Sequence, residues 1–193
     1  MDEIVKQALA KWPNVPHCTG WLLLDRRGQW RMRDEAAQAA GALGDPIRHE
    51  ALIGFINRNY ERDADGQWFF QNGPQRVYVE LAYTPWIVRL SAMDGALRLT
   101  DHTGAPFEPA HAWLDDEGAL LFSDDATPPR VAALHDHDLE LFSSHATFDD
   151  APRGGVFHWR DETDLPLRPL KRAEVGTRFG FVASPAARAA SRA

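Results

Sequence analysis

The sequence predicts an α+β protein in which repeated antiparallel β-hairpins pack on one main helix, arranged as two small interleaved halves. Three observations predict this class. An Asp-x-x-Gly turn motif recurs between apolar segments. One segment after residue 45 has the apolar spacing of an amphipathic helix. Hydrophobic residues make up 44% of the 193 residues, which is enough to form a core.

Residues 2–11 are predicted to form a short helix, because Val5, Ala8 and Leu9 fall on one side at helical spacing. Pro13 ends it, since proline has no backbone donor and restricts the residue before it. The alanine-rich stretch 34–44 follows later. It fits either a helical turn or a mobile insertion, and the sequence does not choose between them.

The main helix is predicted to start at Asp45-Pro46 and to reach Tyr60. Asp45 can cap the free backbone donors, and Pro46 suits the first helical position because its missing N–H would be unpaired there. Leu52, Phe55 and the residues at helical spacing around them form the apolar stripe.

The remaining chain has the pattern of strands joined by Asp-x-x-Gly turns. An aspartate at the first turn position can accept a hydrogen bond from the backbone two residues on, and glycine can supply the positive φ that closes the turn. The motif occurs at 25–28, 63–66, 101–104 and 115–118. Each copy therefore predicts a chain reversal whose role is architectural.

We place a domain boundary near Met93. Residues 1–93 are predicted to form a helix-plus-hairpin domain and residues 94–182 a mainly β, acidic domain. Residues 183–193 consist of alanine, serine, proline and arginine, and they are predicted to be disordered.

The formal net charge of −7 argues against a general binder of nucleic acids or of anionic membranes. The charge is uneven: residues 115–164 hold 13 acidic and 3 basic side chains, whereas residues 165–193 hold 1 acidic and 6 basic ones. This asymmetry suggests that the basic segment folds back onto the acidic one. No secretory signal or membrane-spanning run is visible and there is one cysteine, so a cytoplasmic location is expected.

Three segments together resemble uncharacterised proteobacterial proteins with a domain of unknown function. The segments are 46–53, the hairpin 63–68 with its Asp-Gly-x-Trp pattern, and the strand 74–81 with the pattern Pro-x-x-Val-x-Val-Glu. The resemblance covers the first half of the chain well and the second half only by its turns. It implies a two-part α+β fold with repeated strand motifs and a role in bacterial signalling, and it implies no catalytic residues.

The polar loop 71–76 and the strand after it form the predicted ligand-binding site. Its guanidinium and amides could grip a carboxylate, a phosphate or the backbone of a partner. The alternative is a hairpin turn whose amides bond to their own backbone. The predicted ligand-binding residues are Gln71, Asn72, Gln75, Arg76 and Tyr78.

A second, competing site is the run 135–138. On a strand, His135 and His137 would share a face and could chelate a transition metal with Asp138. A metal site needs three or four converging ligands, and the spacing suggests only this local pair. The alternative is a polar turn that leads into the next apolar segment.

The sequence thus favours a binding or regulatory module without a catalytic residue or a cofactor. Its partner would be a protein or a small acidic ligand, with neither nucleic acid nor membrane involved. A homodimer that exposes its strand edges is a third hypothesis. The alternative is a metal-dependent hydrolase that uses the histidine and aspartate cluster.

Overall fold

The computed structural model describes residues 1–149, 154–160 and 163–191. It is an α+β structure, as the sequence predicts, but its plan is different in detail: the described residues form two mixed β-sheets and six α-helices instead of hairpins on one main helix. The chain divides into two compact units, which interleave along the sequence. Unit 1 comprises residues 1–25, 29–83 and 181–193, and unit 2 comprises residues 26–28 and 84–180.

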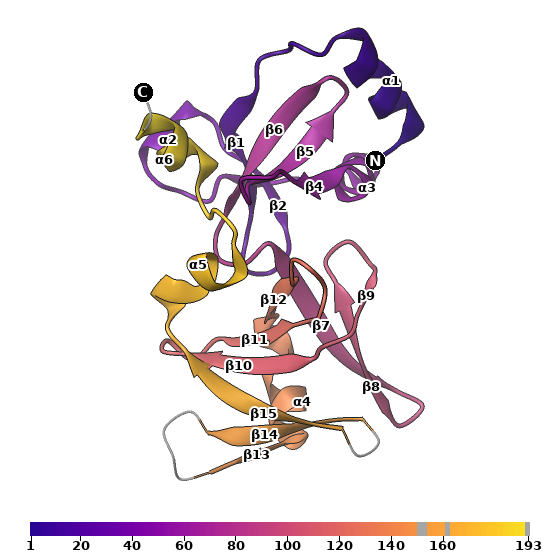
Figure 1. The fold of residues 1–193 in the computed structure, drawn as a ribbon, viewed down its shortest axis with the longest axis vertical. Helices are drawn as coiled ribbons and strands as arrows, with labels where there is room; N and C mark the ends of the chain where they lie inside the picture. The colour runs from indigo at the N-terminus through magenta and orange to yellow at the C-terminus, as the bar shows by residue number, and fades with distance from the viewer. Residues whose placement is uncertain (150–153, 161–162, 192–193) are drawn as a thin grey trace. The chain divides into compact units, whose positions relative to one another are not determined.

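Unit 1 is built on a six-stranded sheet (Figure 1). Its central strands β1 and β6 run parallel, and all other neighbours are antiparallel. In sheet order the strands are β3 (Asp45–Pro46), β2 (Trp30–Met32), β1 (Cys18–Leu24), β6 (Gln75–Leu81), β5 (Trp68–Asn72) and β4 (Tyr60–Arg62). The helices are α1 (Glu3–Lys11), α2 (Glu35–Ala39), α3 (Glu50–Arg58) and α6 (Pro185–Ala190).

The main predicted helix starts later than the sequence suggests. Asp45 and Pro46 form strand β3, which pairs with β2 through Arg31↔Pro46 and Met32↔Asp45. Helix α3 begins at Glu50, and the Nδ1 atom of His49 accepts a 3.2 Å hydrogen bond from the N–H of Leu52. Tertiary strand pairing therefore takes the two residues that were predicted as the cap and the first turn.

The four Asp-x-x-Gly segments connect antiparallel strands, and all four aspartates accept backbone hydrogen bonds. The donors are Gln29 for Asp25 (2.9 Å); Asp65 and Gln67 for Asp63 (2.9 and 2.8 Å); Thr103 and Ala105 for Asp101 (2.9 and 3.1 Å); and Glu117 and Ala119 for Asp115 (2.9 and 2.7 Å). These turns are local structures, because each is satisfied by its own backbone.

Unit 2 contains a nine-stranded sheet, in which two of the pairs, β10–β15 and β12–β7, are parallel. In sheet order the strands are β13 (Ala146–Phe148), β14 (Gly155–Arg160), β15 (Thr163–Leu170), β10 (His111–Asp115), β11 (Leu120–Ser123), β12 (Val131–Leu134), β7 (Trp86–Met93), β8 (Ala96–Asp101) and β9 (Pro106–Phe107). Helices α4 (Leu139–Ser144) and α5 (Val175–Phe179) complete it, with short 3-10 turns before each.

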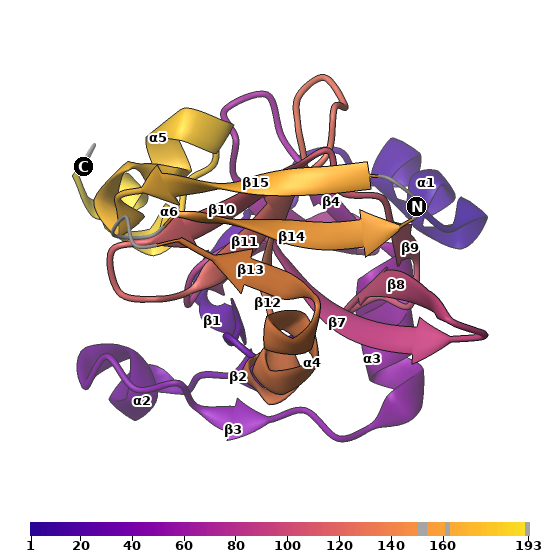
Figure 2. The same ribbon diagram turned by 90° about the horizontal axis from the view of Figure 1, so that it is seen from below.

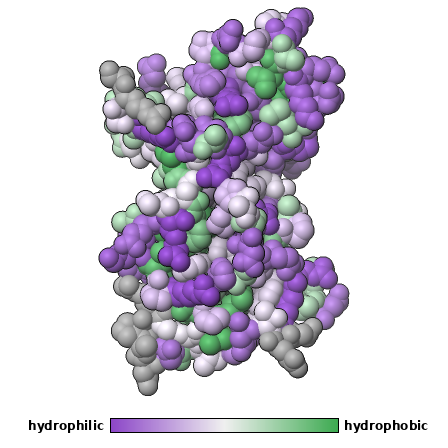
Figure 3. Space-filling model, viewed as in Figure 1, coloured by the Kyte–Doolittle hydropathy of each residue, from purple (hydrophilic) through white to green (hydrophobic). Residues whose placement is uncertain are grey.

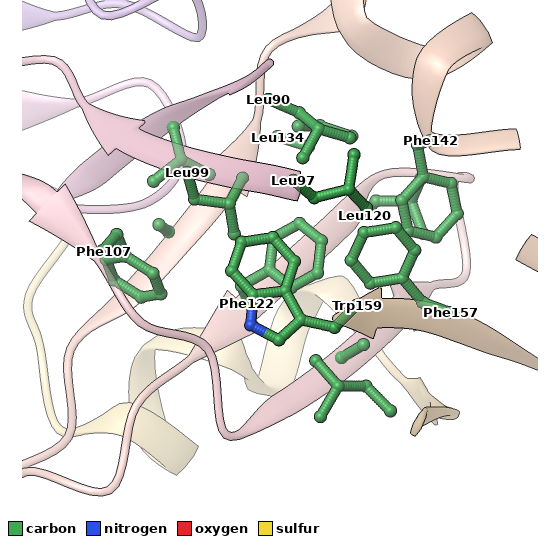
Figure 4. Packing of buried hydrophobic residues seen from close by; sticks show 14 of the residues in the cluster. Leu90, Leu97, Leu99, Phe107, Leu120, Phe122, Leu134, Phe142, Phe157 and Trp159 are labelled. Carbon is green, nitrogen blue, oxygen red and sulfur yellow. The ribbon is translucent and has the colours of Figure 1, made fainter. Parts of the chain in front are cut away.

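The core of unit 2 lies between strands of this sheet and α4 (Figure 4). Figure 2 shows α4 near both β13 and β7, strands at different places in the sheet order, so the sheet curves around the helix. Phe122, Phe142 and Phe157 are completely buried there, and the rings of Phe142 and Phe157 stack at 4.6 Å. Each such side chain contributes ~1.5–3 kcal/mol by leaving water.

The basic C-terminal segment does contact the acidic region of unit 2. The guanidinium of Arg172 donates to the buried Asp115 carboxylate at 2.9 Å and also pairs with Glu117. Further on, residues 183–193, for which the sequence predicts disorder, contain helix α6.

Figure 3 shows a surface on which hydrophilic residues predominate, with hydrophobic residues in small groups between them. Within the described part of the chain, no helix combines the length and the apolar character needed to cross a membrane.

Candidate functional site

A hollow of about 470 Å³ opens in unit 2 beside strands β10 and β15 and helix α5. Its volume falls in the range of sites that take small molecules. The lining comes from four separate segments of the chain, within residues 111–113, 123–129, 168 and 178–179. The residues that carry its chemistry are His111, Trp113, Asp124, Asp125, Arg168 and Arg178.

Trp113 forms the floor of this hollow. It is 4% exposed, and its indole N–H donates a 3.1 Å hydrogen bond to the hydroxyl of Ser123 on the neighbouring strand β11. Phe179 of α5 packs edge-on against the ring at 5.9 Å. The ring is therefore held on two sides and provides a rigid aromatic platform.

Two guanidiniums lie over this one ring. Arg168 is the register partner of Trp113 on the parallel strand β15, and its guanidinium is 5.4 Å from the ring centre. The guanidinium of Arg178, from α5, lies 4.2 Å from the same ring. Among the described residues, neither guanidinium forms an ion pair or a hydrogen bond. Both are exposed, so their N–H donors face solvent.

The lining also includes two aspartates, which differ in how their charge is matched. The Asp124 carboxylate accepts from the Nε of Arg130 at 2.6 Å and from the backbone N–H of Arg130 at 2.8 Å, so its charge is matched. Asp125 is 81% exposed at its side chain and lies 3.5 Å from Nε2 of His111. The hollow therefore presents two unmatched guanidiniums and one exposed carboxylate.

This arrangement can bind an anion. A guanidinium offers several donors in a planar fork that matches a carboxylate or phosphate, and stacking on an aromatic ring limits the conformations that the side chain must lose on binding.

A second hollow, of about 330 Å³, lies near strands β14 and β15. At its edge the hydroxyl of Thr147, the imidazole of His158 and the carboxylate of Asp164 form a chain of 2.9 and 2.8 Å hydrogen bonds. This order resembles a catalytic triad. However, the side chains of His158 and Asp164 are 50% and 60% exposed and sit opposite each other on paired strands, as solvated cross-strand neighbours do.

The predicted ligand loop lies in unit 1, on strands β5 and β6, and much of it is engaged internally. Gln71 is completely buried, and its amide donates to the carbonyl of Gly73 at 2.9 Å. The amide of Gln75 donates to the carbonyl of Pro16 at 3.0 Å. Asn72 is exposed at the end of β5.

Arg76 and Tyr78 are the two predicted residues that the structure brings together. They lie on one face of β6; the Arg76 guanidinium stacks on the ring of Phe69 at 4.5 Å and bonds to Tyr78. The Tyr78 hydroxyl donates to Asp63 at 3.1 Å, and burial raises the pKa of this tyrosine. This site has one guanidinium, whereas the hollow of unit 2 has two.

The run 135–138 forms the start of helix α4. Nδ1 of His135 accepts from the backbone N–H of His137 at 3.1 Å. Asp138 is buried and accepts from Nε and Nη2 of Arg89 at 2.7 and 3.0 Å, and from the N–H of Leu90 at 2.9 Å. Although burial alone would raise the pKa of Asp138, these hydrogen bonds lower it overall. No three metal-ligating side chains gather anywhere in residues 1–149, 154–160 and 163–191.

Comparison with protein families assigns the chain. Residues 1–186 match the family model DUF2944, described as "Protein of unknown function (DUF2946)". The chain belongs to this family. No curated protein matches.

Two solved structures are similar to this member of the family. A DUF1285 family protein from Silicibacter pomeroyi DSS-3 is 17% identical, with a TM-score of 0.46, over 87% of this chain and 96% of that one. A DUF1285 family protein from Shewanella baltica OS155 is 11% identical, with a TM-score of 0.41, over 65% and 91%.

Proposed function

We propose that the protein is a non-catalytic binding module for a small acidic ligand, which occupies the hollow over Trp113. The observation that carries the proposal is the pair of guanidiniums, from Arg168 and Arg178, that share one aromatic ring without a carboxylate partner among the described residues. Like charges placed together repel each other, and an anion between them removes this repulsion.

The scaffold supports such a site because it fixes the two cations before the ligand arrives. Arg168 is held by the register of two parallel strands and Arg178 by a helix whose Phe179 packs on the same ring. Pre-ordered side chains lose less conformational entropy on binding, so more of the interaction energy appears as affinity.

The test is titration of the protein with inorganic phosphate and with succinate, followed by calorimetry at low ionic strength. We expect Arg168→Ala and Arg178→Ala each to weaken binding about tenfold or more, in line with the loss of a charge-assisted hydrogen bond. Arg178→Lys keeps the charge and loses the fork, so it should weaken binding less than alanine does. Equal affinities in the wild type and in both alanine variants would contradict the proposal.

The loop around Arg76 is the second candidate for the same function, because its guanidinium is also stacked on a ring and bears no ion pair within the described residues. Arg76→Ala is therefore the matched variant in the titration. If only this variant loses binding, the acidic ligand binds in unit 1. A regulatory role, a protein partner, a homodimer and a cytoplasmic location stay predictions from the sequence.

A further inference from the structure

The hollow of unit 2 contains a carboxylate as well as its two guanidiniums, and this carboxylate limits which acid fits. Asp125 lines the hollow together with Arg168 and Arg178. A ligand with anionic groups only would place one of them near Asp125 and be repelled.

Asp125 differs from the neighbouring Asp124 in what neutralises it. Asp124 is matched by the Arg130 guanidinium and by two backbone N–H groups, from Ala126 and Arg130. The only ion-pair partner of Asp125 among the described residues is the imidazole of His111 at 3.5 Å, which is charged only when protonated. Among the described residues, the hollow therefore has two positive charges, from Arg168 and Arg178, and one negative charge, from Asp125, that no permanently charged group neutralises.

The loop that carries Asp125 is also well fixed. The side chain of Asp124 bridges the backbone of Ala126 and of Arg130, so it closes the loop at both ends. The backbone of Asp125 lies between these two contacts, and its side chain belongs to the lining of the hollow. Fixed groups discriminate between ligands more strongly than mobile ones do.

We infer that the ligand is an acidic zwitterion of the amino-acid type, with two anionic groups toward Arg168 and Arg178 and one ammonium group toward Asp125. This inference rests on the proposed function and deepens it, because it names the class of acid. The charges of such a ligand, two negative and one positive, are the complement of those of the hollow.

Glutamate and glutarate are the probes, since they differ by one ammonium group. Calorimetry on the full chain should give an affinity for glutamate at least tenfold above that for glutarate. Asp125→Asn should reduce this ratio below threefold by weakening glutamate and strengthening glutarate. Asp125 is exposed, so the variant keeps its fold, and Glu140→Gln, an exposed change on α4, is the control that keeps the wild-type ratio.

The outcomes separate the two proposals. If glutarate binds as well as glutamate does, and both depend on Arg178, the zwitterion is wrong and the acid-binding function stands. A ratio that Asp125→Asn leaves unchanged also overturns the inference. If neither probe binds, nor phosphate nor succinate, both proposals fail together.

Discussion

The carboxylate of Glu80 and the hydroxyl of Ser184 form a 2.6 Å hydrogen bond that joins strand β6 to the start of helix α6, across 104 residues of sequence. Glu80 is 6% exposed and also accepts from the N–H of Ala186 at 3.0 Å. The Ser184 hydroxyl in turn accepts from the N–H of Ala187. The last residue of the Pro-x-x-Val-x-Val-Glu segment is therefore a helix anchor.

Loss of this anchor should release α6. We expect Glu80→Ala to lower the free energy of unfolding by about 1–3 kcal/mol, because two donors lose their acceptor. Glu80→Gln retains an acceptor oxygen, so it should lower the free energy of unfolding less than Glu80→Ala does. Urea unfolding gives the magnitude, and amide exchange in α6 gives the location. If amide exchange of residues 185–190 stays slow in Glu80→Ala, the anchor is elsewhere.

Two glycines of the Asp-x-x-Gly turns should respond differently to alanine. Gly28 and Gly118 have positive φ values of 76° and 85°. A Cβ at Gly118 would meet open space, so Gly118→Ala should lower the free energy of unfolding only by the ~1–2 kcal/mol that a left-handed backbone costs an alanine. A Cβ at Gly28 would lie 2.8 Å from the Cβ of His102, so Gly28→Ala should lower the free energy of unfolding clearly more than Gly118→Ala does. Equal midpoints of urea unfolding for the two variants would refute this.

The turns were predictable from the sequence because the aspartate and its donors lie within four residues of each other. The sequence predicted helix α3 but placed its first residue too early. Asp45 and Pro46 pair with β2 instead, and this pairing depends on a strand about fifteen residues away. For the run 135–138 the sequence offered a strand or a polar turn, and the structure has a 3-10 turn whose backbone His135 caps. The apolar segment after it forms helix α4 instead of a strand.

The hollow of unit 2 was not found from the sequence, for a physical reason. Trp113 and Arg168 become neighbours only through the parallel register of β10 and β15, which no local pattern encodes. The one available signal was the excess of basic residues after Leu165, opposite an acidic region. That charge asymmetry predicted a contact between the two segments, and Arg172 forms it with Asp115. It did not indicate that Arg178 has no ion-pair partner among the described residues.

The stability of unit 2 should fall in mild acid because of His102. Burial lowers its pKa to about 4 from an ordinary 6.5, its ring lies beside Trp86, and its Nδ1 accepts from the N–H of Ile87. The folded state thus favours the neutral ring. Its contribution is complete above pH 6.5 and is lost as the pH falls toward 4, by up to ~3 kcal/mol.

Urea unfolding between pH 7.5 and 4 measures this loss. His102→Asn offers an oxygen to the same N–H and cannot be protonated, so its free energy of unfolding should decrease less over this range. Parallel pH profiles for the wild type and the variant would show that another group is responsible.

Substitution of Asp138 should lower the free energy of unfolding, whereas substitution of the solvent-exposed His137 should leave it almost unchanged. Asp138→Ala removes the acceptor of both Arg89 and Leu90, and we expect a loss of about 2–3 kcal/mol in urea unfolding. Asp138→Asn keeps an acceptor for Leu90 and should lie between. His137→Ala, at an exposed position, should change the stability by less than ~0.5 kcal/mol.

The same variants decide between a helix start and a metal site, when unfolding is repeated with an excess of zinc. A bound metal stabilises the folded state by mass action, so a real site would raise the wild-type midpoint and leave that of His137→Ala unchanged. We expect zinc to give no such difference, because Nδ1 of His135 is occupied by the N–H of His137 and the carboxylate of Asp138 is occupied by Arg89 and Leu90. With both ligand groups already bonded within the fold, a metal would have to displace the contacts that begin helix α4.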